Sequence, residues 1–163
     1  MKGSEAISES TAAKIETALT HALADRELQN DLRQRTLNHI EIVSAGIDLG
    51  TQEMRPDNFS DYAFAEDRVV DAVLELSLTQ VGFVGGGGDD PTLSLVITAH
   101  ASLNGTTENG VLWEAEQVTY VSEAAAFSLW TAGDSGLIQA EMDNGLESVA
   151  SQLGEALFAS PVI

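Results

Sequence analysis

Cysteine is absent from the chain of 163 residues. Disulfides, thiolate nucleophiles and cysteine-ligated metals are therefore excluded within this sequence. Also missing is any apolar run near the roughly 20 residues that a membrane-spanning helix needs. No apolar signal-peptide core follows Met1–Ser4. We expect either a cytoplasmic or virion protein, or a chain that begins after a removed export segment, with any lipid-bearing cysteine upstream of Met1.

Basic residues are scarce. Seven Lys and Arg face 26 Asp and Glu, so the formal net charge is −19. Such a surface repels the phosphates of nucleic acids and the headgroups of anionic lipids, and binding to either through a basic patch is not expected. Salt screens the repulsion among the acids themselves, so this composition is typical of a salt-rich environment. We therefore expect a halophilic or marine source.

The common catalytic and cofactor motifs are lacking. None of the three histidines belongs to an HExxH motif or stands four residues from another histidine, and no Gly-x-Ser-x-Gly elbow is found. A Ser-His-Asp triad built around His100 stays open, because the partners of a triad meet only in the fold. We predict no catalytic residue, no cofactor and no metal, with a small hydrolase of unrecognised site as an alternative.

Four consecutive glycines, Gly85–Gly88, stand between two predicted strands. A phosphate-binding loop would continue into Gly-Lys-Ser/Thr and a helix, whereas this run continues into Asp89 and Asp90, which repel phosphate. The two aspartates lack the ligand spacing of a calcium hand. We therefore expect residues 85–91 to form a flexible hairpin loop.

The chain length fits one domain, residues 1–163. Residues 1–36 are predicted to be helical, with helices over 5–24 and from Asp25 to about Arg35, or one bent helix. A closing helix is predicted over 135–158, where Gly145 and Gly154 each cost about 1 kcal/mol relative to alanine. Its apolar stripe consists of Ile138, Met142, Leu146, Val149, Leu153 and Leu157.

Between these helices, residues 38–122 are predicted to form a sheet. Alternating apolar residues indicate strands over 38–46, 70–83, 92–103 and 111–122. The connections are expected to be a loop over 48–62, a short helix over 62–69 and a linker over 124–133.

The last three strands suggest an antiparallel meander with one apolar face. Each terminal helix also has one apolar stripe, and a two-layer arrangement buries all of them. We predict an α+β fold, a two-layer sandwich with a four- to five-stranded, largely antiparallel sheet and the N- and C-terminal helices packed on one face.

Four aromatic residues near strand ends and the linker are candidate partner contacts, because Trp and Tyr dominate the energetics of many interfaces. They are Trp113, Tyr120, Phe127 and Trp130. Burial in the core is the alternative for each of them. Unbroken alternation would place Trp113 and Tyr120 on opposite faces of their strand, unless a bulge reunites them.

Three segments resemble a known family. Asp71–Leu76, the pair Leu93–Leu103 and Asn109–Trp113, and the closing Leu146–Leu157 resemble, in that order, strands and a C-terminal helix of bacterial envelope lipoproteins with small α/β periplasmic domains. The resemblance covers about residues 68–158. It departs from the family in lacking a lipidated cysteine and in its strong acidity.

This resemblance implies a non-enzymatic domain of the periplasm or cell envelope, tethered by lipid, that assists assembly or transport by binding other proteins. It supplies no catalytic residues. The alternative is a self-assembling structural protein, cytoplasmic or viral, from a salt-rich source. The partner is therefore expected to be another protein or a second copy of the chain.

Overall fold

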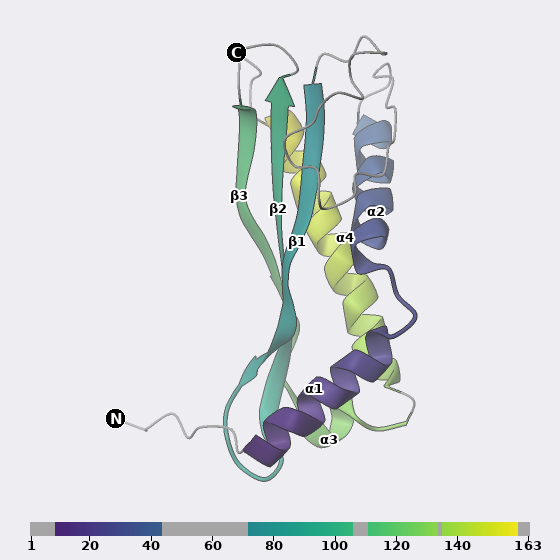
Figure 1. The fold of residues 1–163 in the computed structure, drawn as a ribbon, viewed down its shortest axis with the longest axis vertical. Coiled ribbons are helices and arrows are strands. Elements are labelled where there is room, and N and C mark those ends of the chain that lie inside the picture. The colour runs from purple at the N-terminus through teal and green to yellow at the C-terminus, as the bar shows by residue number, and fades with distance from the viewer. Residues whose placement is uncertain (1–8, 44–71, 106–110, 134, 160–163) are drawn as a thin grey trace, which may run out of the picture.

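The computed structural model describes residues 9–43, 72–105, 111–133 and 135–159. Four strands form one antiparallel sheet with helices packed against it, so the predicted α+β fold is confirmed. In Figure 1 the long strands make one layer, and α2 (Leu28–Val43) and α4 (Gly136–Ala159) lie side by side as the second. Helix α1 (Glu9–Leu23) crosses the same end of the molecule as the short α3 (Phe127–Trp130).

The three long strands form the predicted meander. β1 (Ala72–Gly85), β2 (Thr92–Gly105) and β3 (Val111–Val121) pair as antiparallel neighbours in chain order. The two-residue β4 (Ala125–Ala126) pairs with the beginning of β2. The glycine-rich segment closes the β1–β2 hairpin, where Gly88 has a φ of 114°, a conformation that only glycine adopts at little cost. β2 is thus central, and β1 and β3 are the two edges.

Register shifts interrupt the ladder on each side of β2. In β1 the pairing jumps from Leu78 to Gln80, and the core-facing residues change from even to odd numbers beyond this point. In β3 one extra residue lies between Ala115 and Val118, relative to the facing part of β2. An extra residue reverses which face the following side chains occupy. This is the kind of bulge that could reunite Trp113 and Tyr120, although the Trp113 side chain lies outside the described residues.

The strand predicted over 38–46 is wrong, because α2 continues to Val43. Ile40 and Ile42 alternate as in a strand, but Ile40 also stands four residues after Thr36 and eight after Leu32. All three of Leu32, Thr36 and Ile40 are buried on one side of α2. Extending a formed helix adds one hydrogen bond for each residue fixed, without a new nucleation cost. α1 and α2 are separate helices, divided at residues 24–27.

The predicted linker over 124–133 contains β4 and α3. Asp90 holds the start of α3, because its Oδ1 accepts the Ser128 backbone N–H and its Oδ2 accepts the Ser128 hydroxyl, both at 2.7 Å. These bonds lower the pKa of the Asp90 carboxyl. Asp90 therefore bonds to the first turn of α3 from the β1–β2 loop, whereas the N-cap residue itself, Ala126, makes no side-chain bond. The loop and short helix predicted over 48–62 and 62–69 lie outside the described residues.

One core lies between the sheet and the helices. The inner face of β2 contributes Leu93, Leu95, Ile97, Ala99 and Ala101, and α4 contributes Ile138, Met142, Leu146, Val149, Ala150 and Leu153. Leu32 of α2, Ala22 of α1 and Trp130 of α3 complete it. The alternation predicted for the second strand and the stripe predicted for the closing helix both point into this core, except that Leu157 is only partly buried.

Gly145 lets α4 approach the sheet closely. A Cβ at this position would stand 2.5 Å from Ile97 Cδ1 and 2.7 Å from Tyr120 Cδ1, which is far inside van der Waals contact. The missing side chain therefore allows the backbone of α4 to pack directly on β2 and β3. Glycine lowers the helix propensity at this position, but any larger residue would prevent the close packing of α4 on the sheet.

Candidate functional site

The edge of β1 is covered by a side chain from α2. The Gln29 amide donates from Nε2 to the carbonyl of Leu76 (2.7 Å), and its Oε1 accepts the backbone N–H of Leu78 (2.9 Å). The carboxamide of Gln29 thus bonds to a backbone carbonyl and to a backbone N–H two residues further along β1. A neighbouring strand would bond to the same two groups. Edge strands invite pairing with other chains, and natural proteins block them with covering elements of this kind.

Replacing Gln29 by alanine should uncover the β1 edge. The loss of two largely exposed hydrogen bonds should lower the free energy of unfolding by about 1 kcal/mol. The variant should also associate more readily, because a second strand edge becomes available. Urea unfolding and sedimentation velocity measure the two effects. Gln34→Ala, at an exposed position of the same helix, is the matched control, and equal behaviour of the two variants would contradict the covering role of Gln29.

The edge of β3 lacks such a cover among the described residues. The Ser122 N–H donates to the Leu95 carbonyl (2.9 Å), and the Leu95 N–H donates to Ser122 Oγ (2.8 Å), so these two residues face each other. In an antiparallel ladder the direction of the backbone groups alternates along each strand. Tyr120 therefore bonds toward β2, whereas the N–H and C=O groups of Thr119 and Val121 point away from it. Within the described ranges no other residue bonds to these outward groups.

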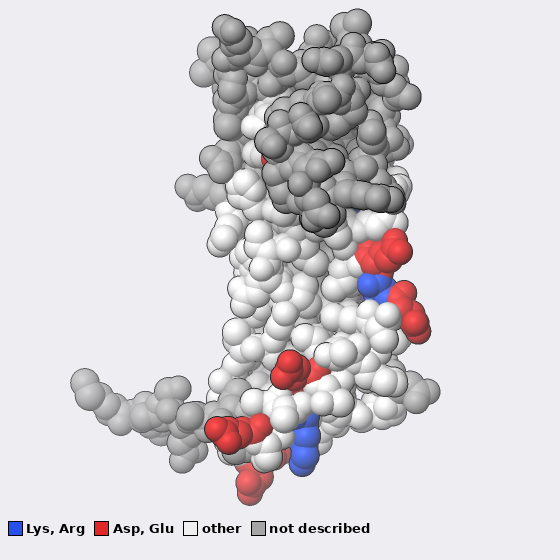
Figure 2. Space-filling view, viewed as in Figure 1, with Lys and Arg blue, Asp and Glu red and all other residues white. Residues whose placement is uncertain are grey.

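An exposed apolar side chain accompanies this edge on the sheet face opposite the helices. Val121 is 56% exposed, and Val96, which faces it in register on β2, is buried. The exposed Val84 lies on β1, at the other edge of the sheet. Next to Val96 and Val121, the hydroxyls of Thr98 and Thr119 share a hydrogen bond of 3.1 Å. Figure 2 shows that the described surface over the strands carries few charges in this view, and that the charged side chains gather over the helices. The surface beside the β3 edge is therefore suited to direct contact.

The candidate partner residue Trp130 is a core residue instead. It is only 1% exposed, and its indole N–H donates to the carbonyls of Leu93 (3.0 Å) and Ala125 (3.2 Å). The ring of Phe83 meets it edge to face, with centroids 4.9 Å apart. A buried indole needs a hydrogen-bond acceptor, and the β2–β4 junction supplies two. Trp130 thus anchors α3 to the sheet, which is the core placement that the sequence left as the alternative.

The other three aromatic candidates have separate places. Phe127 is half-buried against the core, and its N–H donates to the Pro91 carbonyl (2.8 Å). Tyr120 is half-buried on the inner side of β3. The side chain of Trp113 lies outside the described residues. The described structure therefore brings only Tyr120 to the β3 edge, and it does not gather the predicted aromatic residues into one patch.

Tyr120 links β3 to α4 through Glu141. Its hydroxyl donates to Glu141 Oε2 at 2.6 Å. Burial, the hydrogen bond to Glu141 and the negative charges of Glu141 and Glu123 raise the pKa of Tyr120 to about 12. Each of these effects disfavours the phenolate. Glu141 and Glu123 thus both place acidic side chains near the end of β3.

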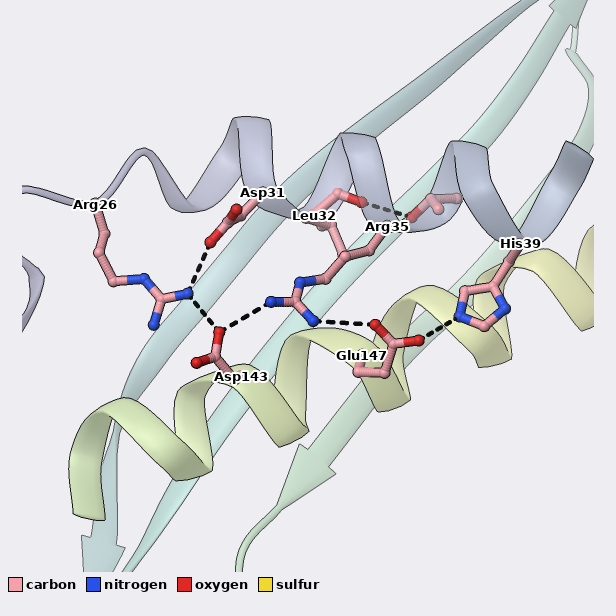
Figure 3. A network of polar contacts seen from close by, with 8 residues as sticks. Arg26, Asp31, Leu32, Arg35, His39, Asp143 and Glu147 are labelled. Atoms are coloured by element: carbon pink, nitrogen blue, oxygen red, sulfur yellow. Dashed lines mark hydrogen bonds and ion pairs between the residues drawn. The ribbon is translucent and has the colours of Figure 1, made fainter. Parts of the chain in front are cut away.

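A chain of ion pairs joins α2 to α4, shown in Figure 3 and called here the ion-pair ladder. It consists of Arg26, Asp31, Arg35, His39, Asp143 and Glu147. Asp143 Oδ1 accepts from Arg26 (2.7 Å) and from Arg35 (2.9 Å). Glu147 accepts from Arg35 at 3.0 Å and contacts His39 Nε2 at 2.8 Å. The cationic side chains project from α2 and the segment before it, and the carboxylates of α4 receive them.

The ion-pair ladder lowers the pKa of Glu147, through the hydrogen bond with His39 first and that with Arg35 second. A carboxyl whose pKa is depressed by folding stabilises the fold above its unfolded pKa, about 4.3, and loses this contribution as the pH falls through its folded value. Glu147 is about half exposed, so solvent screening keeps the contribution of each pair below about 1 kcal/mol.

Glu147→Gln should therefore lower stability modestly at neutral pH and reduce the loss of stability on acidification below about pH 4.3. Urea midpoints measured between neutral and acidic pH check both effects. Glu155→Gln is the control, because Glu155 lies on the same helix and bonds only to Ser151 among the described contacts. Parallel pH profiles for wild type and Glu147→Gln would contradict the role of this pair.

The histidines do not assemble a recognisable catalytic centre in the described part of the chain. His21 is exposed at the end of α1, His39 belongs to the ion-pair ladder, and His100 is half-buried on β2, opposite Ser77 in register. Over the residues that the structure describes, no three His, Asp or Glu side chains come together in a way that could hold a metal ion.

Comparisons with known proteins return no relative. The chain matches no protein-family model, no curated protein sequence and no solved structure. Of the helices that the structure describes, none has the length and hydropathy required to cross a bilayer. The site must therefore be interpreted from its own geometry.

The residues that define the two edges were not found by sequence reasoning. Gln29 is one of several polar residues on a helix, and nothing local shows that it meets a strand 47 residues away. Thr119 and Val121 lie in a strand that was predicted, but the order of strands in the sheet decides which strand is an edge. The sequence does contain one indication that β3 is an edge strand, because the alternating segment 111–122 is the last strand of the predicted meander.

Proposed function

We propose that this domain is a non-enzymatic protein-binding or scaffolding module, which binds an extended segment of another protein along the β3 edge. The observation that carries the proposal is the contrast between the two edges. Gln29 fills the hydrogen-bonding groups of β1, whereas the outward groups of Thr119 and Val121 have no described partner. An added strand would satisfy these groups with its own backbone.

The exposed apolar surface beside this edge supports the same proposal. An added strand places alternate side chains on the two faces of the sheet. Those on the open face would lie next to Val121, whose exposed side chain offers apolar area to bury. Backbone bonds would supply affinity, and these side-chain contacts would supply preference for one sequence over another.

The resemblance of about residues 68–158 to envelope lipoproteins favours the periplasm or cell envelope as the place where this module acts. There, a module that binds extended segments would assist assembly or transport. A small open sheet backed by helices suits such a role, because the edge strand packs against both β2 and α4.

Selection from a library of displayed random decapeptides tests the proposed function. Peptides selected on the wild-type protein should protect the Thr119 and Val121 amides from hydrogen exchange. They should bind Thr119→Pro at least about tenfold more weakly, because proline removes one outward donor of the edge. Thr119→Ala is the matched control, since it removes the same hydroxyl and keeps the backbone N–H.

Equal binding of the selected peptides to both Thr119 variants would overturn the proposal. So would protection of amides elsewhere with none at β3, or a failure to select any peptide. Loss of binding to Thr119→Pro alone would support it, provided that the circular dichroism spectrum of the variant matches that of wild type.

A further inference from the structure

The charges of this chain are segregated along the sequence. All seven Lys and Arg lie within the first 68 residues, and residues 69–163 contain thirteen Asp and Glu with no Lys or Arg. The whole sheet and the closing helix are therefore built without a single lysine or arginine. Any compensation of their acids must come from the first 68 residues or from another molecule.

Within the described residues, the N-terminal helices compensate one side of α4 only. Arg26 and Arg35 are both engaged by Asp143 and Glu147 in the ion-pair ladder. Arg33 donates to Asn30 of its own helix, and Lys14 is exposed on α1. The α2 side of α4 is thus supplied with positive charge.

On the β3 side of α4, the described residues place no Lys or Arg in an ion pair. Glu141 lies beside the edge strand, because it accepts the Tyr120 hydroxyl, and its other described contact is the uncharged amide of Asn144. Glu123 is exposed just past the end of β3. Among the described residues neither carboxylate belongs to an ion pair. Burial is the first cause of the raised pKa of Tyr120, and the hydrogen bond with Glu141 and the charges of Glu141 and Glu123 add to it.

A second copy of the chain fits this edge poorly. The strand itself carries Glu114 and Glu116 and no base, so the same strand of a second copy would bring no positive side chain to Glu123 and Glu141. Each copy also has a net charge of −19. A cationic strand from a different protein meets neither difficulty.

We propose that the segment added to β3 is an extended, basic stretch of a partner protein, whose backbone pairs with Thr119 and Val121 and whose Lys or Arg side chains approach Glu123 and Glu141. This inference rests on the proposed function and adds the chemistry of the partner. Electrostatic attraction would speed the encounter and select against acidic strands. The backbone pairing would fix the orientation.

Synthetic peptides of about eight residues, a common strand length, test the inference on the full chain. One peptide alternates lysine with valine, and a second replaces each lysine by glutamate. A third has the lysine sequence with alternate backbone nitrogens methylated, which keeps the charge and removes strand pairing. Affinities are measured by fluorescence anisotropy at about 0.01 M and about 0.15 M salt, where the screening lengths are about 30 and 8 Å.

The lysine peptide should bind at least about tenfold more tightly than both other peptides at low salt, with a smaller advantage over the glutamate peptide at higher salt. Glu123→Gln combined with Glu141→Gln should remove most of that advantage. Glu155→Gln combined with Glu16→Gln has the same change in net charge away from β3 and should not. The amides of Thr119 and Val121 should become protected only when the lysine peptide is bound.

Each other result is decisive. Equal binding of the methylated peptide means attraction by net charge alone and overturns the strand-addition mechanism. Protection of β3 by the glutamate peptide as strong as that by the lysine peptide overturns the basic partner and leaves the proposed function standing. A dimer that forms through β3 without peptide, seen by sedimentation at low salt, identifies a second copy as the occupant and also overturns it.

Discussion

Replacing Tyr120 by proline should unfold most or all of the domain. The same replacement at the preceding residue, Thr119→Pro, should leave the domain folded. Tyr120 bonds toward β2, so proline removes a ladder hydrogen bond worth about 1 kcal/mol. Loss of the half-buried ring and of its hydrogen bond to Glu141 adds about 2 kcal/mol. Thr119 points its N–H to the free edge, where proline is tolerated. The free energies of unfolding in urea should differ by at least about 3 kcal/mol between the variants.

Alanine variants separate the side chain from the backbone in this comparison. Tyr120→Ala should be less destabilising than Tyr120→Pro, because it keeps the ladder donor. Thr119→Ala should resemble Thr119→Pro, since both lose the hydrogen bond to the Thr98 hydroxyl. If both proline variants unfold alike, the assignment of the outward groups of β3 is wrong, and with it the basis of the proposed binding edge.

Gly145→Val should be the second strongly destabilising change. The added atoms would meet Ile97 and Tyr120, where a Cβ alone already lies within 2.7 Å of both side chains. Overpacking of this kind costs about 1 to 3 kcal/mol, and the upper end is expected for valine. Even Gly145→Ala should destabilise, although alanine gains about 1 kcal/mol in helix propensity over glycine. Thermal and urea unfolding measure these changes.

A double mutant tests the cause. Ile97→Val removes Cδ1, the atom nearest to the added methyl group, and should destabilise less in the Gly145→Ala background than in wild type. Gly136→Ala is the control in the same helix, because a Cβ there would meet nothing within 4 Å. Additive effects of the Ile97 and Gly145 changes would show that the close approach of α4 does not explain the glycine.

The sequence predicts best those helices and strands in which the spacing of apolar residues fits only one type of secondary structure. The alternation of β2 places Leu93, Leu95 and Ile97 in the core, and the spacing of α4 places Ile138, Met142 and Leu146 opposite them. The strand predicted over 38–46 failed because Ile40 satisfies both periods. Only the earlier turns of α2, which already bury Leu32 and Thr36, decide between them.

The candidate site could be predicted only in part. The acidity of β3 and the absence of Lys and Arg beyond residue 68 are visible in the sequence. The contrast between the edges is not, because it depends on Gln29 meeting β1 from a distant helix. Trp130 was misplaced for a related reason. An aromatic residue in a polar segment is typical of an exposed contact residue. Only the fold shows that the carbonyls of Leu93 and Ala125 accept the indole N–H of Trp130.

The ion-pair ladder also sets an order of events during synthesis. Arg26 and Asp143 are 117 residues apart, and Arg35 and Glu147 are 112 residues apart. The ribosome synthesises α2 before the sheet, and the sheet before α4, which carries the carboxylates that pair with these arginines. Contacts between such distant segments are slow to form. Arg26 and Arg35 therefore remain without these carboxylates through most of translation, and α2 and α4 can join only after α4 has emerged.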